Sequence, residues 1–116
     1  MTNKNKVAGT KFEHRVIYLL RKKGFYTVRA GSSLGAFDIL AVKDGIAFGF
    51  QCKYSRDGKL YVPKVELENM VNEAMKNKFY AILVYNKKQK GEKRGKMTFR
   101  ILYAPDNGAF FKSLFS

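Results

Sequence analysis

The sequence has little of what builds disulfides, zinc cages and nucleophilic triads. Its 116 residues include one cysteine, one histidine and two prolines. One cysteine excludes an internal disulfide and a cysteine-based zinc site, and a Ser-His-Asp triad would depend on His14 alone. No apolar run approaches the roughly 20 residues that a membrane-spanning helix needs, and the polar N-terminus lacks the pattern of a signal peptide. We therefore expect a cytoplasmic protein without membrane contact, in the host cytoplasm if the sequence is viral.

Acidic residues are also scarce. The chain has 23 lysines and arginines against 9 aspartates and glutamates, which gives a net charge of +14. A small domain this basic is typical of proteins that bind polyanions, because each neutralised phosphate releases a condensed counterion. The basic segments do not read as amphipathic helices, so nucleic acid is a better expectation than an anionic membrane. The length and the hydrophobic content of 46% predict one domain, with one core, over residues 1–116.

The apolar pattern predicts the element order α-β-β-β-β-α-β-β, which is an α/β domain with a mixed sheet. Residues 1–9 are polar and basic and are expected to form a flexible arm. The first helix is expected to begin at a capping box of Thr10 and Glu13 and to end at Gly24. Pro63 is expected to open the second helix.

Short apolar runs between turn-forming residues predict the strands. They are expected at residues 25–29, 38–42, 47–54, 60–62, 80–85 and 97–103. The last apolar segment, 109–115, is expected either to cover the core or to form part of a dimer interface.

An Asp-Gly pair at residues 44–45 predicts a two-residue hairpin turn. In that register the numbers of paired residues have a constant sum, which places Asp38 opposite Gln51 with both side chains on one face. Lys53 lies two residues beyond Gln51 and shares that face, which we expect to be open. Gly49 on the same face leaves room for a close approach.

These polar side chains suggest a metal site. The oxygens of Asp38 and Gln51 suit Mg²⁺, and Lys53 could polarise water or stabilise a pentacovalent phosphate. The alternative is an ordinary polar sheet face. Glu13 lies on the helical stripe that must face the sheet, where a carboxylate is costly unless a cation meets it. The alternative there is the capping box with Thr10.

Five segments in chain order resemble the archaeal-type Holliday junction resolvases of the PD-(D/E)XK nuclease superfamily. They are Glu13, Arg29-Ala-Gly-Ser32, Asp38, Gln51-Cys-Lys53 and Leu60-Tyr-Val62. The resemblance covers about residues 7–78. It implies a restriction-endonuclease-like core, with a twisted mixed β-sheet flanked by helices. It also implies a homodimeric, metal-dependent endonuclease that resolves four-way DNA junctions by paired nicks.

The resemblance further implies which residues act. In that family the matching acidic residues bind a divalent metal and the lysine assists attack, so Glu13, Asp38, Gln51 and Lys53 would be catalytic. Glu13, Asp38, Gln51 and the backbone carbonyl of Cys52 would hold Mg²⁺, for which Mn²⁺ should substitute. The chain departs from the family at Gln51, where glutamate is usual, and at His14, where arginine is common. The first departure should weaken metal binding unless Glu13 compensates.

Contacts with DNA phosphates are expected from basic and polar residues on several segments: Lys4, Lys6, Arg15, Arg29, Ser32, Tyr61, Lys87 and Lys88. The basic loop 86–96 should contact phosphates without reading bases. Alternatives are a salt bridge between Arg29 and Glu13, packing of Tyr61, and a merely solvated basic loop. Two other functions also remain open. The protein could be a nuclease of this superfamily that acts on other branched or duplex DNA, or a catalytically silent junction-binding module.

Overall fold

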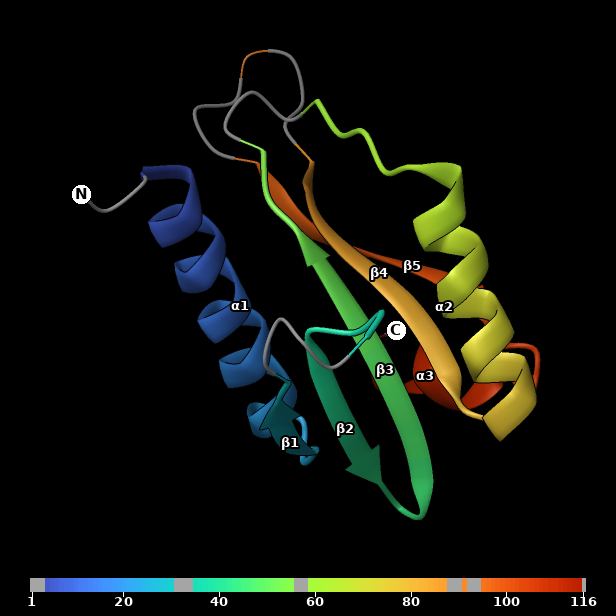
Figure 1. The fold of residues 1–116 in the computed structure, drawn as a ribbon. Helices are drawn as coiled ribbons and strands as arrows, with labels where there is room; N and C mark the ends of the chain where they lie inside the picture. Colours follow the sequence, from blue (N-terminus) through green and yellow to red (C-terminus); the bar gives the residue numbers. More distant parts are fainter. Residues whose placement is uncertain (1–3, 31–34, 56–58, 88–90, 92–94, 116) are drawn as a thin grey trace.

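A computed structural model describes residues 4–30, 35–55, 59–87, 91 and 95–115 (Figure 1). Within these residues the chain forms three helices and one five-stranded sheet. The elements in chain order are α1 (Lys4–Lys22), β1 (Tyr26–Arg29), β2 (Ile39–Lys43), β3 (Ile46–Lys53), α2 (Lys64–Asn77), β4 (Tyr80–Lys87), β5 (Lys96–Tyr103) and α3 (Ala109–Phe115).

The strands lie side by side in the order of the sequence, β1-β2-β3-β4-β5. The β3–β4 pair is parallel and the other three pairs are antiparallel, so the predicted mixed sheet is confirmed. The parallel pair requires a crossover, and α2 makes it. The strand predicted at residues 60–62 is wrong: this segment has no regular structure and leads directly to Pro63, the N-cap of α2.

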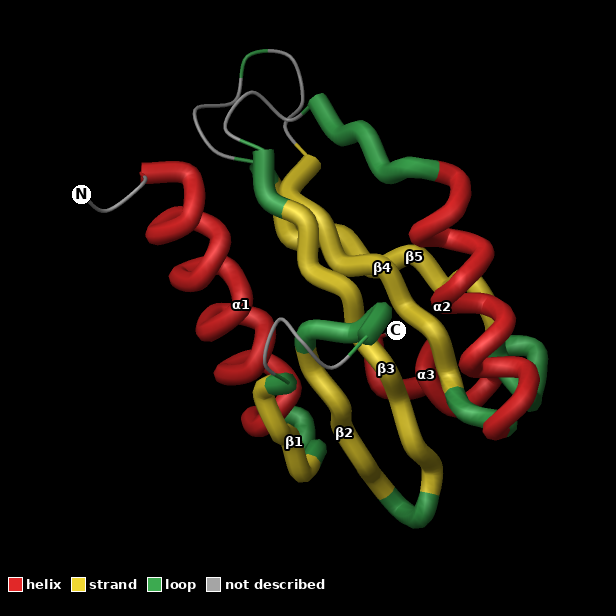
Figure 2. The backbone as a smooth tube through the Cα atoms, in the orientation of Figure 1, coloured by secondary structure: helices red, strands yellow, loops and turns green. Residues whose placement is uncertain are grey.

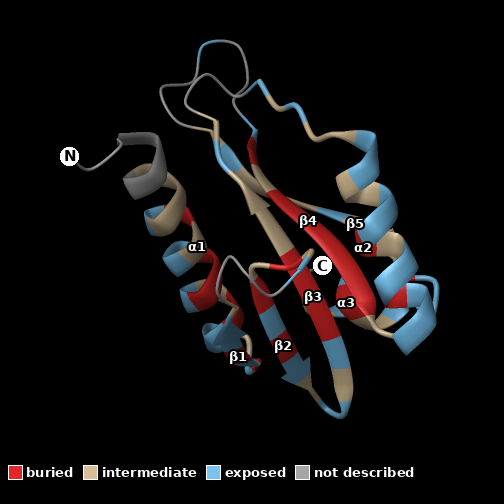
Figure 3. Ribbon diagram, in the orientation of Figure 1, coloured by how far each residue is buried: buried red, intermediate tan, exposed pale blue. Residues whose placement is uncertain are grey.

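The helices cover the two faces of the sheet unequally. Helices α1 and α3 pack on one face and α2 on the other (Figures 1 and 2). Buried residues concentrate on β3 and β4 (Figure 3). Phe111 of α3 is buried in the larger cluster, so segment 109–115 covers the core, one of the two roles expected for it. None of the helices in the described part of the chain combines the length and apolar character that crossing a bilayer requires.

Helix α1 begins earlier than predicted. It starts at Lys4, so the flexible arm expected over residues 1–9 is wrong for residues 4–9, and residues 1–3 lie outside the described part. Each residue added to a formed helix gains a hydrogen bond, and lysine and alanine are good helix formers, so nothing stops the helix at Thr10. The predicted end is confirmed: Gly24 has φ +91° and Phe25 donates its N–H to the Leu20 carbonyl at 3.0 Å.

The predicted hairpin is confirmed. Lys43 pairs with Ile46, and the ladder continues in the expected register to Ile39 and Phe50. Both turn residues adopt left-handed conformations, with φ 50° at Asp44 and 77° at Gly45. The room expected beside Gly49 is filled by the Phe37 ring, because a Cβ on Gly49 would stand only 2.6 Å from it.

Candidate active site

Asp38 stands just before β2 and is held by main-chain bonds from both neighbouring strands. Its N–H donates to the Phe50 carbonyl at 2.8 Å, and its carbonyl accepts the Ala30 N–H at 2.8 Å. The Asp38 Oδ2 accepts the N–H of Cys52 at 2.8 Å. The ladder ends at Ile39–Phe50, so the predicted direct pairing of Asp38 with Gln51 is wrong. A short carboxylate competes well for a main-chain N–H, and here it captures that of Cys52.

The electrostatics of Asp38 link it to four other candidate residues of the site. Burial raises the pKa of the Asp38 carboxyl, and the charge of Glu13 raises it further. The Cys52 N–H and the charges of Lys53 and Arg29 act in the opposite direction. The fold therefore brings Glu13, Asp38 and Lys53 within electrostatic range of one another. A carboxyl perturbed by burial and by a specific charged neighbour is a candidate for a functional site.

Glu13 forms an ion pair with Arg29, as expected for a carboxylate on the side of the helix that faces the sheet. The Arg29 Nε donates to the Glu13 Oε2 at 2.9 Å, joining α1 to the edge strand β1. Thr10 lies inside α1 rather than at its start, so the predicted capping box is wrong. The salt bridge weighed as the alternative role of Arg29 is present, and 46% of the arginine side chain remains exposed.

Lys53 lies at the end of β3 and is not on an open face, contrary to expectation. Helix α2 lies over this face, and the Lys53 Nζ is 3.0 Å from the Glu66 Oε2. That oxygen is buried and has no hydrogen bond of good geometry among the described residues. The contact is therefore an ion pair held by proximity rather than a directed hydrogen bond. Sequence reasoning missed Glu66, because no local pattern gives the register between a helix and the strand beneath it.

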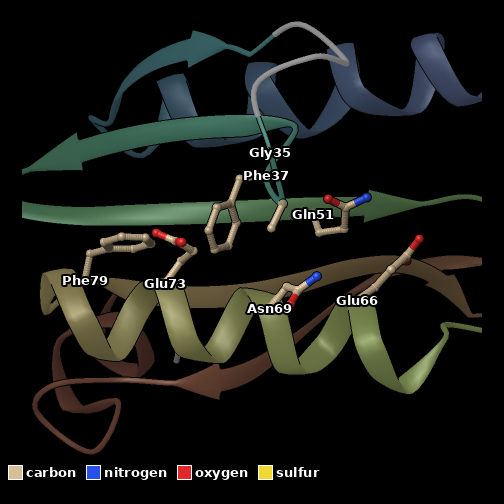
Figure 4. A pocket seen from close by; sticks show the side chains of 8 residues that line it. Gly35, Phe37, Gln51, Glu66, Asn69, Glu73 and Phe79 are labelled. Carbon is tan, nitrogen blue, oxygen red and sulfur yellow. The ribbon is translucent and has the colours of Figure 1, made fainter.

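Gln51 points into a pocket between β3 and α2. The pocket has a volume of about 590 Å³, and its lining includes Gln51, Glu66, Asn69 and Glu73 as polar side chains. Figure 4 shows Gln51 and Glu66 toward one end, and Phe37 and Phe79 toward the other. Gln51 of β3 and Glu66 of α2, the partner of Lys53, therefore line the same end of the pocket.

Cys52 contributes through its backbone. Burial raises the pKa of its thiol, and the charges of Asp38 and Glu13 raise it further. The thiol is therefore a poor nucleophile and a poor metal ligand. Its N–H already holds Asp38, and its side chain packs against the main core.

The residues expected to contact DNA are spread over several elements. Tyr61 is 84% exposed, so the packing weighed for it does not occur. Arg15 is exposed on α1, with its guanidinium carbon 5.4 Å from the Phe12 ring centre, and Lys87 is exposed at the end of β4.

Four further residues were predicted to contact DNA. Lys4 and Lys6 lie in the first two turns of α1, and Ser32 and Lys88 lie outside the described residues. Residues 86–87 and Lys96, expected within the basic loop, belong to strands β4 and β5, while residues 88–90 and 92–94 lie outside the described part of the chain.

The donor set fits a hard divalent cation bound mainly by one carboxylate. Among the described residues no three His, Cys, Asp or Glu side chains form a cluster that could hold a metal. Mg²⁺ does not need such a cage, since it is usually bound by one or two carboxylates together with waters and substrate phosphates. The Asp38 carboxylate, with an amide or carbonyl oxygen from residues 51–52, supplies oxygens of the right hardness.

Known proteins share both the sequence pattern and the fold. The family described as archaeal Holliday junction resolvase matches residues 4–106. The "Crossover junction endodeoxyribonuclease Hjc" of Methanocaldococcus jannaschii is 32% identical over 80 residues, which are 67% of this chain and 59% of that protein.

A solved structure extends the likeness to three dimensions. The Holliday junction resolvase Hjc of Archaeoglobus fulgidus has a TM-score of 0.68 and 23% identity to this chain. The match covers 82% of this chain and 73% of that one. It confirms the predicted restriction-endonuclease-like α/β fold.

Proposed function

The chain belongs to the archaeal Holliday junction resolvase family, and on that premise we propose that it is a metal-dependent endonuclease that resolves four-way DNA junctions by paired nicks. The observation that carries the proposal is the half-buried Asp38 carboxylate, whose Oδ2 accepts the Cys52 N–H at 2.8 Å and which lies within range of the charges of Glu13 and Lys53. The net charge of +14 supports a phosphate-rich substrate.

The candidate residues would have separate roles in metal binding and in catalysis. Asp38, Gln51 and the Cys52 carbonyl would hold Mg²⁺, with Glu13 contributing directly or through a water. Bound Mg²⁺ would stabilise charge on the scissile phosphate and make water more acidic. Lys53 would donate a hydrogen bond to the attacking water or to a phosphate oxygen as negative charge develops there. Mn²⁺ should substitute, because it also favours oxygen ligands.

Paired nicks require two sites, so we propose a homodimer acting on DNA in the cytoplasm. A two-fold axis would present one site to each of two symmetry-related strands of the junction. Exposed Arg15, Tyr61 and Lys87, together with Arg29, would contact the arms, and Lys4, Lys6, Ser32 and Lys88 are proposed for the same role.

The test is cleavage of a labelled four-way junction and of a linear duplex of the same sequence, each with and without Mg²⁺. We expect paired nicks in the junction only when Mg²⁺ or Mn²⁺ is present, by a protein that sediments as a dimer. Equal cutting of the duplex would favour a nuclease acting on other DNA. Metal-independent binding without any cutting would favour a silent junction-binding module.

A further inference from the structure

The carboxylate absent at position 51 has a counterpart on the opposite side of the pocket. Gln51 carries no charge, and Glu13 is engaged by Arg29 at 2.9 Å. The acidic group in salt-bridge contact with Lys53 comes instead from α2, where the Glu66 Oε2 lies 3.0 Å from the Nζ. Gln51 and Glu66 line the same pocket (Figure 4).

The fold fixes Glu66 in this place. It lies in the first turn of α2, which begins after Pro63, and its N–H donates to the Pro63 carbonyl at 3.0 Å. A carboxylate is favoured there by the positive end of the helix. Its buried Oε2 has no directed hydrogen bond among the described residues, so the ammonium of Lys53 is what compensates its lost hydration.

We infer that Glu66 is a positioning residue of the active site: its carboxylate holds the Lys53 ammonium and supplies the negative charge that Gln51 lacks. The inference rests on the proposed function for its catalytic consequence, but not for the contact itself. It implies that the carboxylate can be exchanged between the two positions. A protein with Gln51→Glu and Glu66→Gln together should then retain one carboxylate beside Lys53 and keep its activity.

The alternative is that the Lys53–Glu66 ion pair only stabilises the fold. Ion pairs near the surface commonly contribute little to the free energy of unfolding. The same helix provides a matched control. Glu68 pairs with Lys64 at 3.8 Å, and both side chains are mostly exposed. Glu68→Gln removes the same charge from the same helix, two residues from Glu66, without touching Lys53.

The first measurement is the single-turnover rate of junction cleavage, with junction affinity determined in parallel. Glu66→Gln should lower the rate about tenfold or more, as typical for a residue that orients a site group, while leaving affinity unchanged. Glu68→Gln should change the rate by less than about twofold. The Gln51→Glu, Glu66→Gln double variant should recover most of the loss. Equal rates for Glu66→Gln and Glu68→Gln, or no recovery in the double variant, would overturn the inference.

The second measurement needs neither DNA nor metal. An amine-acylating reagent, followed by mass spectrometry of peptides, reports how accessible the Lys53 amine is. Acylation of Lys53 should be faster in Glu66→Gln than in the wild type, and should return toward the wild-type rate in the double variant. Glu68→Gln should leave it unchanged. If the wild type fails to cut junctions, the proposed function fails, and the acylation alone decides: unchanged reactivity of Lys53 in Glu66→Gln would overturn the positioning role.

Discussion

Asp38 and Asp106 are two aspartates that each precede an element and accept main-chain N–H groups, yet their surroundings differ. Asp106, before α3, accepts the Tyr80 hydroxyl and the N–H groups of Gly108 at 3.0 Å and Phe110 at 3.1 Å. The Tyr80 hydrogen bond is the main cause that lowers the Asp106 pKa. Asp38 accepts one N–H, and burial raises its pKa.

The difference is the one expected between a structural carboxylate and a carboxylate proposed to bind a metal. Asp106 has its charge met by three donors and fastens α3 to the core through Tyr80, whose own pKa burial raises to about 12. Asp38 is half-buried beside the like charge of Glu13, and its pKa is raised despite the nearby charges of Lys53 and Arg29. A cation bound at Asp38 would stabilise its negative charge, whereas the charge of Asp106 is already stabilised by its three hydrogen-bond donors.

The largest expected effect concerns activity at the Asp38 region. Lys53→Ala should reduce junction cleavage by at least about 100-fold, because the group that would stabilise developing charge is removed. Lys64→Ala is the control, since Lys64 is an exposed lysine at the start of the neighbouring helix. Single-turnover cleavage of both variants checks this. A wild-type rate for Lys53→Ala would remove Lys53 from the chemistry.

The next effect concerns stability at the Asp106 region. Asp106→Ala should lower the free energy of unfolding by about 1–3 kcal/mol, because the hydroxyl of buried Tyr80 loses its acceptor. Asp106→Asn keeps one acceptor oxygen and should lose less. Denaturant unfolding measures both, and cleavage by the folded variants should match the wild type. An Asp106→Ala protein as stable as the wild type would contradict the structural role.

The smallest expected effect is the opposite pH dependence of the two regions. The Asp106 pKa is lower in the folded protein than the ordinary carboxyl pKa. The ionised carboxylate therefore stabilises the fold above the ordinary value, and this stability is lost as the pH falls through the lowered value. The Asp38 pKa is higher in the folded protein than the ordinary carboxyl pKa. Stability should therefore fall as the pH rises from the ordinary value through the raised value, because the carboxyl ionises less readily in the folded state. Without metal, Asp38→Asn should therefore be more stable than the wild type at neutral pH, and Asp106→Asn less stable.

Unfolding of the three proteins from about pH 2 to pH 7 tests these signs, because both differences should shrink at the acidic end. The same sign for the two variants at neutral pH would contradict the comparison between the regions.

Local chemistry is what the sequence predicted well. The Asp-Gly turn at 44–45 set the register of β2 and β3, since both turn residues must adopt left-handed φ angles. Gly24 ended α1 for the same kind of local reason. The likeness to a nuclease family, carried by five segments that include Glu13, Asp38 and residues 51–53, led to the correct fold.

Long-range placement is what the sequence could not supply. The start of α1 depends on the balance of helix propagation at Lys4, with no sequence signal to mark it. The segment 60–62 has strand-forming residues but no neighbouring strand to pair with in the described sheet. Glu66 reaches Lys53 only because α2 crosses the sheet at that point, and the register of a helix on a sheet is a property of the whole core.

The most direct test of the account is Asp38→Asn, with cleavage and binding of a four-way junction measured on one preparation. Asparagine can still accept the Cys52 N–H, so the fold should be retained, while the charge that would hold the metal is lost. The account predicts that Mg²⁺-dependent cleavage falls by at least about 100-fold, with junction affinity close to that of the wild type. Cleavage near the wild-type rate would show that Asp38 is not the centre of the site.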